Sequence, residues 1–138
     1  DETGEEIRRV GKEFGAVTGR NRRCGWGDLV ALKYAIMVNG VTDLVMMKAD
    51  VLDSFEEIKV CVAYEKDGER TEDMPYDTEG WAPVYETLPG WHCDLTGVRA
   101  EADFPKAYAD YIAYLEDKLA TRIAILSVGP ERDATIIR

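Results

Sequence analysis

Apolar side chains recur at helical spacing in two stretches of the chain. Residues 105–119 carry apolar side chains about one turn apart, which predicts an amphipathic helix. Residues 29–38 carry a wide apolar face; Asp28 can cap this helix at its start, and Gly40 is a typical stop. A capping-box pattern over residues 3–10 predicts a shorter helix at the beginning of the chain.

Runs of apolar and β-branched residues predict the strands. A continuous apolar run over residues 44–47 is typical of a strand that is covered on both faces. The Asp67-Gly68 pair is typical of a two-residue hairpin turn, and it joins a strand over residues 58–64 to a polar return strand over residues 69–74. Two further strands are predicted over residues 122–128 and 134–137.

The stretch between the hairpin and the last helix shows no such periodicity. Residues 75–104 contain three prolines and three glycines, so we expect them to be irregular, with residues 85–91 as a packed loop. Elsewhere strands alternate with helices. This order predicts an α/β fold in a single domain, with a mixed sheet and flanking helices.

The charge of the chain limits the classes of ligand that it can bind. Its 138 residues include 17 Lys and Arg against 27 Asp and Glu, a net charge of −10. Such a chain repels phosphate backbones, which argues against nucleic-acid binding, and any small anion must be held by a local cluster of positive charge. No apolar run approaches the roughly 20 residues of a membrane span, so no membrane partner is expected.

The cysteines and the start of the chain indicate a cytoplasmic piece of a larger protein. Cys24, Cys61 and Cys93 form neither a CxxC pair nor a cluster with histidine, so we expect a reducing compartment, no disulfide framework and no zinc site. The first six residues do not resemble a signal peptide. Residues 5–10 have the pattern of an amphipathic turn, whose apolar side would have to pack on another part of the protein. We therefore expect a segment of a longer protein, either processed or cut out.

A cluster of positive charge does occur, near the start of the chain. Arg20, Arg22 and Arg23 lie within four residues, between glycines that let the backbone approach a ligand, and a predicted helix follows. Guanidinium groups pair with carboxylate and phosphate oxygens. We interpret this arginine loop as a site for a small polyanion, and surface ion pairs are an equally good alternative.

Two tripeptides that follow predicted buried strands could bind a purine. The Asp50 carboxylate could accept hydrogen bonds from the N1–H and 2-amino groups of guanine, which adenine lacks, while the Lys48 stem lies along the base. The Ser127 hydroxyl and nearby backbone N–H groups could meet a base carbonyl or a ribose. Taken alone, each tripeptide is better explained as a solvated strand end. The two together strengthen the hypothesis of a purine site, because ligands of α/β sheets bind beyond the carboxyl ends of strands.

Long segments of the chain resemble adenylosuccinate synthetase, the purine-pathway ligase. The matching segments run in the family's order through essentially the whole chain, at residues 13–20, 22–26, 48–53, 59–64, 85–91 and 127–133. The resemblance implies that the chain is the C-terminal part of a larger, P-loop-like nucleotide-binding fold. It also implies a reaction in which IMP and L-aspartate are joined, with GTP and Mg²⁺, through a 6-phosphoryl-IMP intermediate.

The family's binding residues carry over to this sequence by resemblance. The aspartate-binding loop would comprise Ala16, Val17, Thr18, Gly19, Arg20, Asn21 and Arg22. The residues implied for GTP are Arg22, Lys48, Ala49, Asp50, Ser127, Val128 and Gly129. In these assignments Thr18 holds the aspartate carboxylates, Arg20 contacts aspartate and the IMP ribose, and Arg22 lies between aspartate and GTP. Val17 departs from the pattern, because the family usually has threonine there.

The resemblance also implies which groups the chain lacks. The family's catalytic residues, phosphate loop and Mg²⁺ ligands lie in its N-terminal part, so this segment is expected to hold no catalytic or metal-binding residue and to be inactive without that part. The single histidine, His92, is interpreted as structural. The family generally forms homodimers. Two alternatives stay open: a stand-alone, non-catalytic nucleotide- or carboxylate-binding module, and a domain that only folds and packs, its arginines forming ion pairs.

Overall fold

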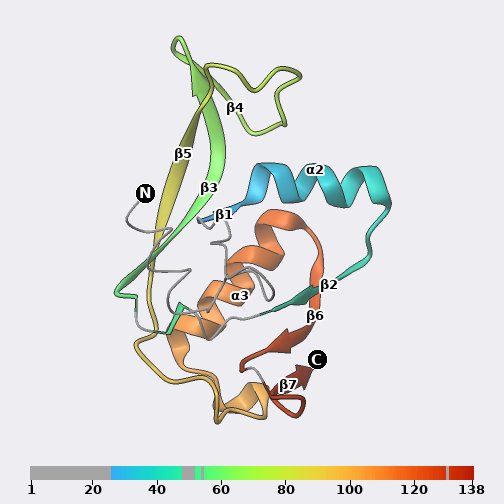
Figure 1. Cartoon of the computed structure of the whole chain (residues 1–138), viewed down its shortest axis with the longest axis vertical. Helices are drawn as coiled ribbons and strands as arrows, with labels where there is room; N and C mark the ends of the chain where they lie inside the picture. The colour runs from blue at the N-terminus through green and yellow to red at the C-terminus, as the bar shows by residue number, and fades with distance from the viewer. Residues whose placement is uncertain (1–25, 48–51, 54, 130) are drawn as a thin grey trace, which may run out of the picture.

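The computed structural model describes residues 26–47, 52–53, 55–129 and 131–138 of the chain (Figure 1). The predicted helix over residues 3–10, the arginine loop and residues 48–50 lie outside these ranges. The described elements include two mixed sheets and two α-helices, α2 (Leu29–Asn39) and α3 (Lys106–Leu119). The predicted α/β class is confirmed, with the strands shared between two sheets rather than one.

The first sheet is built around its longest strand, β3, which rises along the molecule in Figure 1. One edge of β3 pairs with β5 in antiparallel orientation for most of its length. The other edge pairs with β1 (parallel) near the middle and with β4 (antiparallel) near the end. The bounds of these strands are Gly27–Asp28 for β1, Glu57–Lys66 for β3, Glu69–Thr71 for β4 and Ala82–Pro89 for β5.

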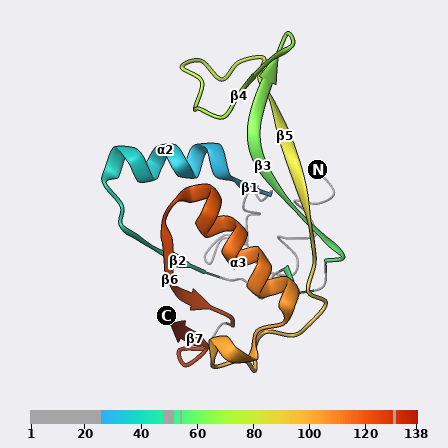
Figure 2. The same cartoon turned by 180° about the vertical axis from the view of Figure 1, so that it is seen from behind.

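The second sheet has the order β2-β6-β7, with β2 and β6 parallel and β7 antiparallel. Its strands form close to the predicted positions: Asp43–Met46 for β2, Arg122–Ser127 for β6 and Thr135–Ile137 for β7. A short 3-10 helix, η2 (Glu101–Asp103), precedes α3. The view from behind shows α3 lying across the face of this sheet (Figure 2).

The helices predicted over residues 29–38 and 105–119 both form, and local chemistry sets the ends of α2. Asp28 caps α2, because its Oδ1 accepts a hydrogen bond from the Ala31 N–H at 3.1 Å, and Gly40 ends the helix in a left-handed conformation. Among the described residues, no helix has the length and apolar character to cross a bilayer. The buried face of α3 contains the predicted apolar stripe and comprises Tyr108, Tyr111, Ile112, Leu115 and Leu119.

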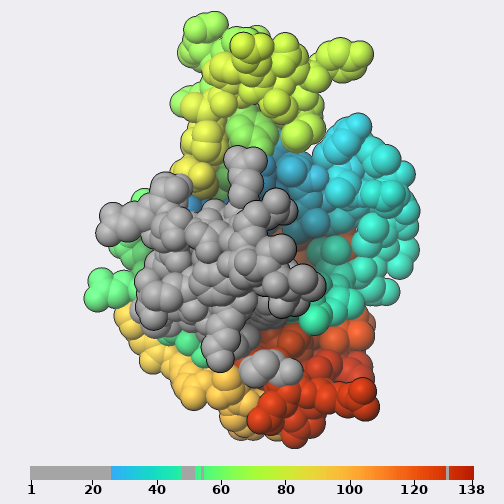
Figure 3. Space-filling model, viewed as in Figure 1, coloured from blue at the N-terminus to red at the C-terminus, as the bar shows by residue number. Residues whose placement is uncertain are grey.

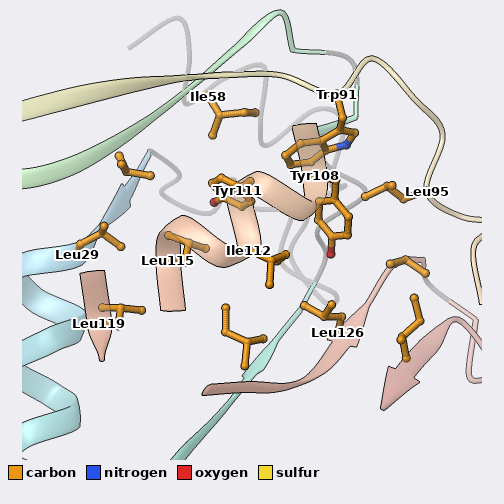
Figure 4. Close-up of a cluster of buried hydrophobic side chains, with 14 of the residues drawn as sticks. Leu29, Ile58, Trp91, Leu95, Tyr108, Tyr111, Ile112, Leu115, Leu119 and Leu126 are labelled. Carbon is orange, nitrogen blue, oxygen red and sulfur yellow. The ribbon is translucent and has the colours of Figure 1, made fainter. Parts of the chain in front are cut away.

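The core lies where α3 packs between the two sheets (Figure 4). Ile58 of β3 lies on one side of the helix and Leu126 of β6 on the other, and neither is more than 1% exposed. Trp91 packs edge-on against Tyr108, with ring centroids 4.9 Å apart, and at a tilt against Tyr111, at 5.4 Å. These ring contacts attach the irregular segment after β5 to the core.

Helix α2 is fully buried only at its start. Leu29 and Val30 are buried, whereas Met37 is 71% exposed and Val38 is 60% exposed. The predicted wide apolar face is therefore fully buried only in the first turn, and beyond it Ile36 packs against the core while partly exposed. The remainder of the helix lies at the side of the molecule, cyan in Figure 3.

The prediction that β2 is covered on both faces is wrong for the part of the chain that the structure describes. Val45 is 55% exposed and Met47 is 66% exposed. β2 is an edge strand of its sheet, and Leu44 and Met46 pack against the core from one face. A continuous apolar run indicates a doubly covered strand only where elements cover both sides, and the described elements cover one.

The prediction of an irregular chain over residues 75–104 is wrong where β5 forms. Residues 85–91, predicted as a packed loop, lie mostly in this eight-residue strand. Pro83 and Pro89 argue against a central strand. Among the described residues, however, β5 pairs with β3 alone, and an edge strand tolerates proline because its outer edge needs no N–H donor.

The predicted hairpin turn connects β3 to β4. Asp67 and Gly68 both have positive φ, 51° and 82°, as a type I′ turn requires. β4 ends at Thr71, so the return strand is shorter than the predicted residues 69–74. The turn projects from the body of the molecule (Figures 1 and 3).

A close backbone crossing joins the end of β5 to the residues before β3. The Gly90 N–H donates to the Glu56 carbonyl at 2.8 Å. A Cβ added to Gly90 would lie 1.9 Å from the Phe55 carbonyl oxygen, a separation that no side chain can adopt. Glycine is therefore required at this position by the approach of the two backbones.

We expect Gly90→Ala to destabilise the fold. The free energy of unfolding should fall by at least about 2 kcal/mol, because the crossing backbones must move apart. Urea unfolding followed by tryptophan fluorescence measures this change. Gly97→Ala is the matched control, since nothing lies within 4 Å of a Cβ there, and it should cost less than about 0.5 kcal/mol. Equal effects of the two substitutions would contradict the prediction.

Candidate functional site

The two strands that precede the strand-end tripeptides, β2 and β6, end side by side in the second sheet. β2 and β6 are parallel neighbours, and Met46 pairs with Leu126 at their carboxyl ends. The chain therefore leaves the sheet toward residues 48–50 and toward residues 127–129 from adjacent positions, as in the binding regions of α/β sheets. Lys48, Ala49 and Asp50 lie outside the described residues, and Ser127, Val128 and Gly129 lie within them.

Some polar groups of the turn after β6 already have partners. Val128 is fully buried, and its N–H donates to the Ala134 carbonyl at 2.9 Å. Ser127 is 9% exposed, and its hydroxyl donates to the Gly129 carbonyl at 3.3 Å. Because a hydroxyl oxygen carries two lone pairs, Ser127 can still accept a hydrogen bond from a ligand. The Val128 N–H is engaged within the protein.

The same turn packs tightly against the segment that follows Trp91. A Cβ at Gly129 would lie 3.2 Å from the Ala134 Cβ and 3.5 Å from the Thr96 Cγ2. Thr96 follows Leu95, which is fully buried in the core. The position of the turn after β6 therefore depends on where residues 95 and 96 lie.

One carboxylate links that segment to the residues that follow 48–50. The two oxygens of Asp53 accept hydrogen bonds from the Trp91 Nε1–H at 2.7 Å and from the Leu95 N–H at 2.8 Å. These partners lie 38 and 42 residues further along the chain. No local sequence pattern marks Asp53 for this role, and the side chain becomes visible as a link only in three dimensions.

The first described residue, Trp26, lies beside the same residues. Trp26, the first described residue after the loop, packs edge-on against Phe55, with ring centroids 5.5 Å apart. The Phe55 N–H donates to the Leu52 carbonyl at 3.2 Å, next to Asp53. The described flanks of all three predicted loops are therefore connected by contacts. We call this region the junction; it comprises residues 26, 52–53, 55, 90–96 and 127–129.

In the part of the chain that the structure describes, no three His, Cys, Asp or Glu side chains gather so that they could hold a metal ion. His92 is exposed and has a left-handed backbone, with φ of 45°. Cys61, which is buried, and Cys93, which is exposed, carry free thiols.

The sequence of the chain matches a known family along nearly its whole length. The sequence model for adenylosuccinate synthetase covers residues 1–136. The chain belongs to the adenylosuccinate synthetase family. Its relatives include the adenylosuccinate synthetases of Porphyromonas gingivalis, 61% identical over 139 residues, and of Phocaeicola vulgatus, 60% identical over 139 residues. Each alignment covers 100% of this chain and 33% of the relative.

A solved structure of the family has the same fold. The fully ligated adenylosuccinate synthetase from Plasmodium falciparum matches the chain with a TM-score of 0.93 and 34% sequence identity. The match covers 100% of this chain and 34% of that one. The chain thus spans about a third of the length of these family members. The resemblance inferred from the sequence is confirmed.

The family's binding residues are described only in part. The residues after β6 lie in the described structure, whereas residues 16–22 and 48–50 lie outside it. What the structure brings together is the flanks of these segments, through the Trp26–Phe55 and Asp53–Leu95 contacts. The binding roles of the residues themselves stay predictions.

Asp28, at the start of α2, is held by two hydrogen bonds. Its Oδ1 caps α2, and its Oδ2 accepts a hydrogen bond from the Tyr64 hydroxyl of β3. Burial, together with this hydrogen bond, raises the pKa of Tyr64. Burial and the charge of Asp28 also raise the pKa of the Cys61 thiol. One carboxylate therefore joins the start of α2 to the first sheet directly after the loop.

We expect Tyr64→Phe to make the fold less sensitive to alkaline pH. An unfolded tyrosine ionises near pH 10, whereas the pKa of Tyr64 is higher in the fold, so its contribution to stability is complete below pH 10 and is lost as the pH rises further. Phenylalanine cannot titrate. The free energy of unfolding should therefore fall more steeply above pH 10 in the wild type than in Tyr64→Phe.

Urea unfolding at a series of pH values measures this difference. At pH 7, Tyr64→Phe should be less stable than the wild type, because the hydrogen bond to Asp28 is lost. Tyr76→Phe is the control, since Tyr76 is fully exposed, and it should follow the wild-type curve. Parallel curves for Tyr64→Phe and the wild type above pH 10 would refute the assignment.

Proposed function

We propose that this chain is one part of a purine-biosynthesis ligase that joins IMP and L-aspartate to form adenylosuccinate, with hydrolysis of GTP. The observation that carries the proposal is the junction, where the flanks of an arginine loop and of two strand-end tripeptides meet in a member of the adenylosuccinate synthetase family. The remainder of the binding site would come from the other two thirds of the enzyme.

On the nucleotide side, the two strand-end tripeptides would bind the guanine base of GTP. The Asp50 carboxylate would accept hydrogen bonds from N1–H and the 2-amino group, and the Lys48 stem would cover the base. From the adjacent strand end, the Ser127 hydroxyl oxygen would accept a further hydrogen bond. The pairing of Met46 with Leu126 supports this arrangement, because the strands that precede the two segments end side by side.

On the amino-acid side, the arginine loop would bind L-aspartate. Arg20 and Arg22 would offer guanidinium groups whose geometry matches carboxylate oxygens, and Thr18 would add a hydroxyl donor. A local cluster of arginines is needed because the chain carries 27 acidic against 17 basic side chains and repels carboxylates elsewhere. The packing of Trp26 on Phe55 supports a position for this loop beside the nucleotide side.

In the proposed reaction, this chain binds and orients substrates. The amino group of L-aspartate attacks C6 of 6-phosphoryl-IMP, and inorganic phosphate leaves. On the family resemblance, we assign the metal ligands and the proton-transferring groups to the rest of the enzyme. The isolated chain would then be inactive. The family resemblance adds a homodimer in the cytoplasm to the proposal.

A full-length hybrid enzyme tests the proposed function. This chain is joined to the remaining two thirds of the Porphyromonas gingivalis relative, in place of the segment with 61% identity. The hybrid should form adenylosuccinate from IMP and L-aspartate only when GTP is present, as followed by ultraviolet absorbance. The two thirds without this chain should be inactive. A folded hybrid that binds GTP without forming product would instead favour a non-catalytic binding module.

Asp50→Ala in the hybrid tests the contact with guanine. We expect the KM for GTP to rise at least tenfold and the preference for GTP over ATP to fall by a similar factor, because each hydrogen bond to a charged group contributes about 1.5–3 kcal/mol. Asp43→Ala, at the opposite end of β2, is the control and should leave both values unchanged. An unaltered nucleotide preference in Asp50→Ala would count against base recognition by this carboxylate.

A further inference from the structure

We propose that Asp53 is a positioning residue that sets the selectivity of the enzyme for guanine nucleotides. Its carboxylate would hold the segment that carries Lys48 and Asp50 in a fixed position relative to the turn that carries Ser127. The inference rests on the proposed function, because it concerns the same nucleotide site. Asp53 itself would not contact the nucleotide.

The partners of Asp53 are fixed in the core. Trp91, which donates to Asp53 through Nε1 at 2.7 Å, is 6% exposed and lies against the rings of Tyr108 and Tyr111 on α3. Leu95, which donates through its backbone N–H at 2.8 Å, is fully buried. Figure 4 shows Trp91 and Leu95 together at one end of the core. Asp53 is thus attached to a rigid framework.

The same framework carries the second nucleotide segment. Thr96 directly follows Leu95, and its Cγ2 lies 3.5 Å from the position of a Cβ on Gly129. The turn is held from its other side, because the Val128 N–H donates to the Ala134 carbonyl at 2.9 Å. One short segment, residues 91–96, therefore contacts both Asp53 and the turn after β6.

The short chain between Asp50 and Asp53 limits how far Asp50 can lie from the hydrogen bonds that Asp53 accepts. Asp50 precedes Asp53 by three residues, and a fully extended chain spans at most about 3.6 Å per residue, or roughly 11 Å in all. On the other side, β2 ends at Met46, beside Leu126 of β6. Met46 and Asp53, on either side of residues 48–50, therefore both contact elements that lead to Ser127. Loss of the hydrogen bonds from Trp91 and Leu95 to Asp53 would leave the carboxylate of Asp50 less well aligned with a base.

Asp53→Asn is the sharpest substitution for a test. Asparagine has nearly the same shape as aspartate, so the change opens no cavity. Its side chain offers one oxygen acceptor and one N–H₂ donor, and the donor would face either Trp91 Nε1–H or the Leu95 N–H. One of the two hydrogen bonds must therefore be lost, and the charge that strengthens both is removed.

The experiment uses the full-length hybrid enzyme and two nucleotides, GTP and inosine triphosphate, which lacks the 2-amino group. In Asp53→Asn we expect the KM for GTP to rise at least tenfold and the preference for GTP over inosine triphosphate to fall at least fivefold. The kcat at saturating GTP and the KM for L-aspartate should change less than twofold. A general loss of structure would not produce this separation.

Two further variants complete the design. Trp91→Phe keeps an aromatic ring against α3 but removes the Nε1–H donor, so it should shift the nucleotide preference in the same direction by a smaller factor. It also replaces Asp53→Asn if that variant does not fold. Asp77→Asn is the matched control, because Asp77 accepts a backbone hydrogen bond from Glu79 at 3.0 Å in an exposed loop. It should leave all kinetic parameters unchanged.

The outcomes separate this inference from the proposed function. If the unsubstituted hybrid prefers GTP and Asp53→Asn retains that preference, the inference is overturned and the proposed function stands. Equal increases in KM for GTP, IMP and L-aspartate would also overturn it, because they would indicate a structural role alone. If the unsubstituted hybrid shows no guanine preference, both the proposed function and the inference fail.

Discussion

The fold of this chain depends on one crossing, where residues 90–95 pass over residues 52–56. At the crossing, the Gly90 backbone lies so close to Phe55 that a side chain cannot be accommodated. Directly after it, Trp91 packs in the core against two tyrosines of α3 and donates to Asp53. The crossing therefore places the end of β5, the core helix and the segment before β3 relative to one another. The second sheet joins this arrangement through the contact of Thr96 with Gly129.

The sequence predicts the helices well because their signals are local. The cap at Asp28, the left-handed stop at Gly40 and the apolar stripe of α3 each depend on residues within a few turns. β5 has no comparable signal. Its prolines and exposed polar residues are those of a loop, and the strand exists because β3 offers a free edge more than fifteen residues away in sequence. Edge strands of this kind are fixed by tertiary pairing.

In the candidate site, too, local features could be predicted from the sequence and tertiary contacts could not. That both tripeptides follow the carboxyl ends of strands could be predicted, and ligands of α/β sheets bind at such ends. That these strands, β2 and β6, are parallel neighbours is known only from the structure. The links between the loops could not be predicted, because Trp26 with Phe55 and Asp53 with Leu95 join residues that are distant in sequence and share no motif. Nor does the sequence indicate that the Val128 N–H is already bonded to Ala134 or that the Ser127 hydroxyl donates to Gly129.

The β3–β4 hairpin lies at the opposite end of the molecule from the second sheet in both views (Figures 1 and 2). Its turn at Asp67 and Gly68 is exposed, and the two strands are paired up to the residues next to the turn, Lys66 and Glu69. Exposed loop tips of this kind accept inserted residues with little effect on the remainder of a domain. The hairpin is thus a natural point for attaching a fluorophore or an affinity tag, where a label would leave the strand ends of the second sheet accessible to ligands.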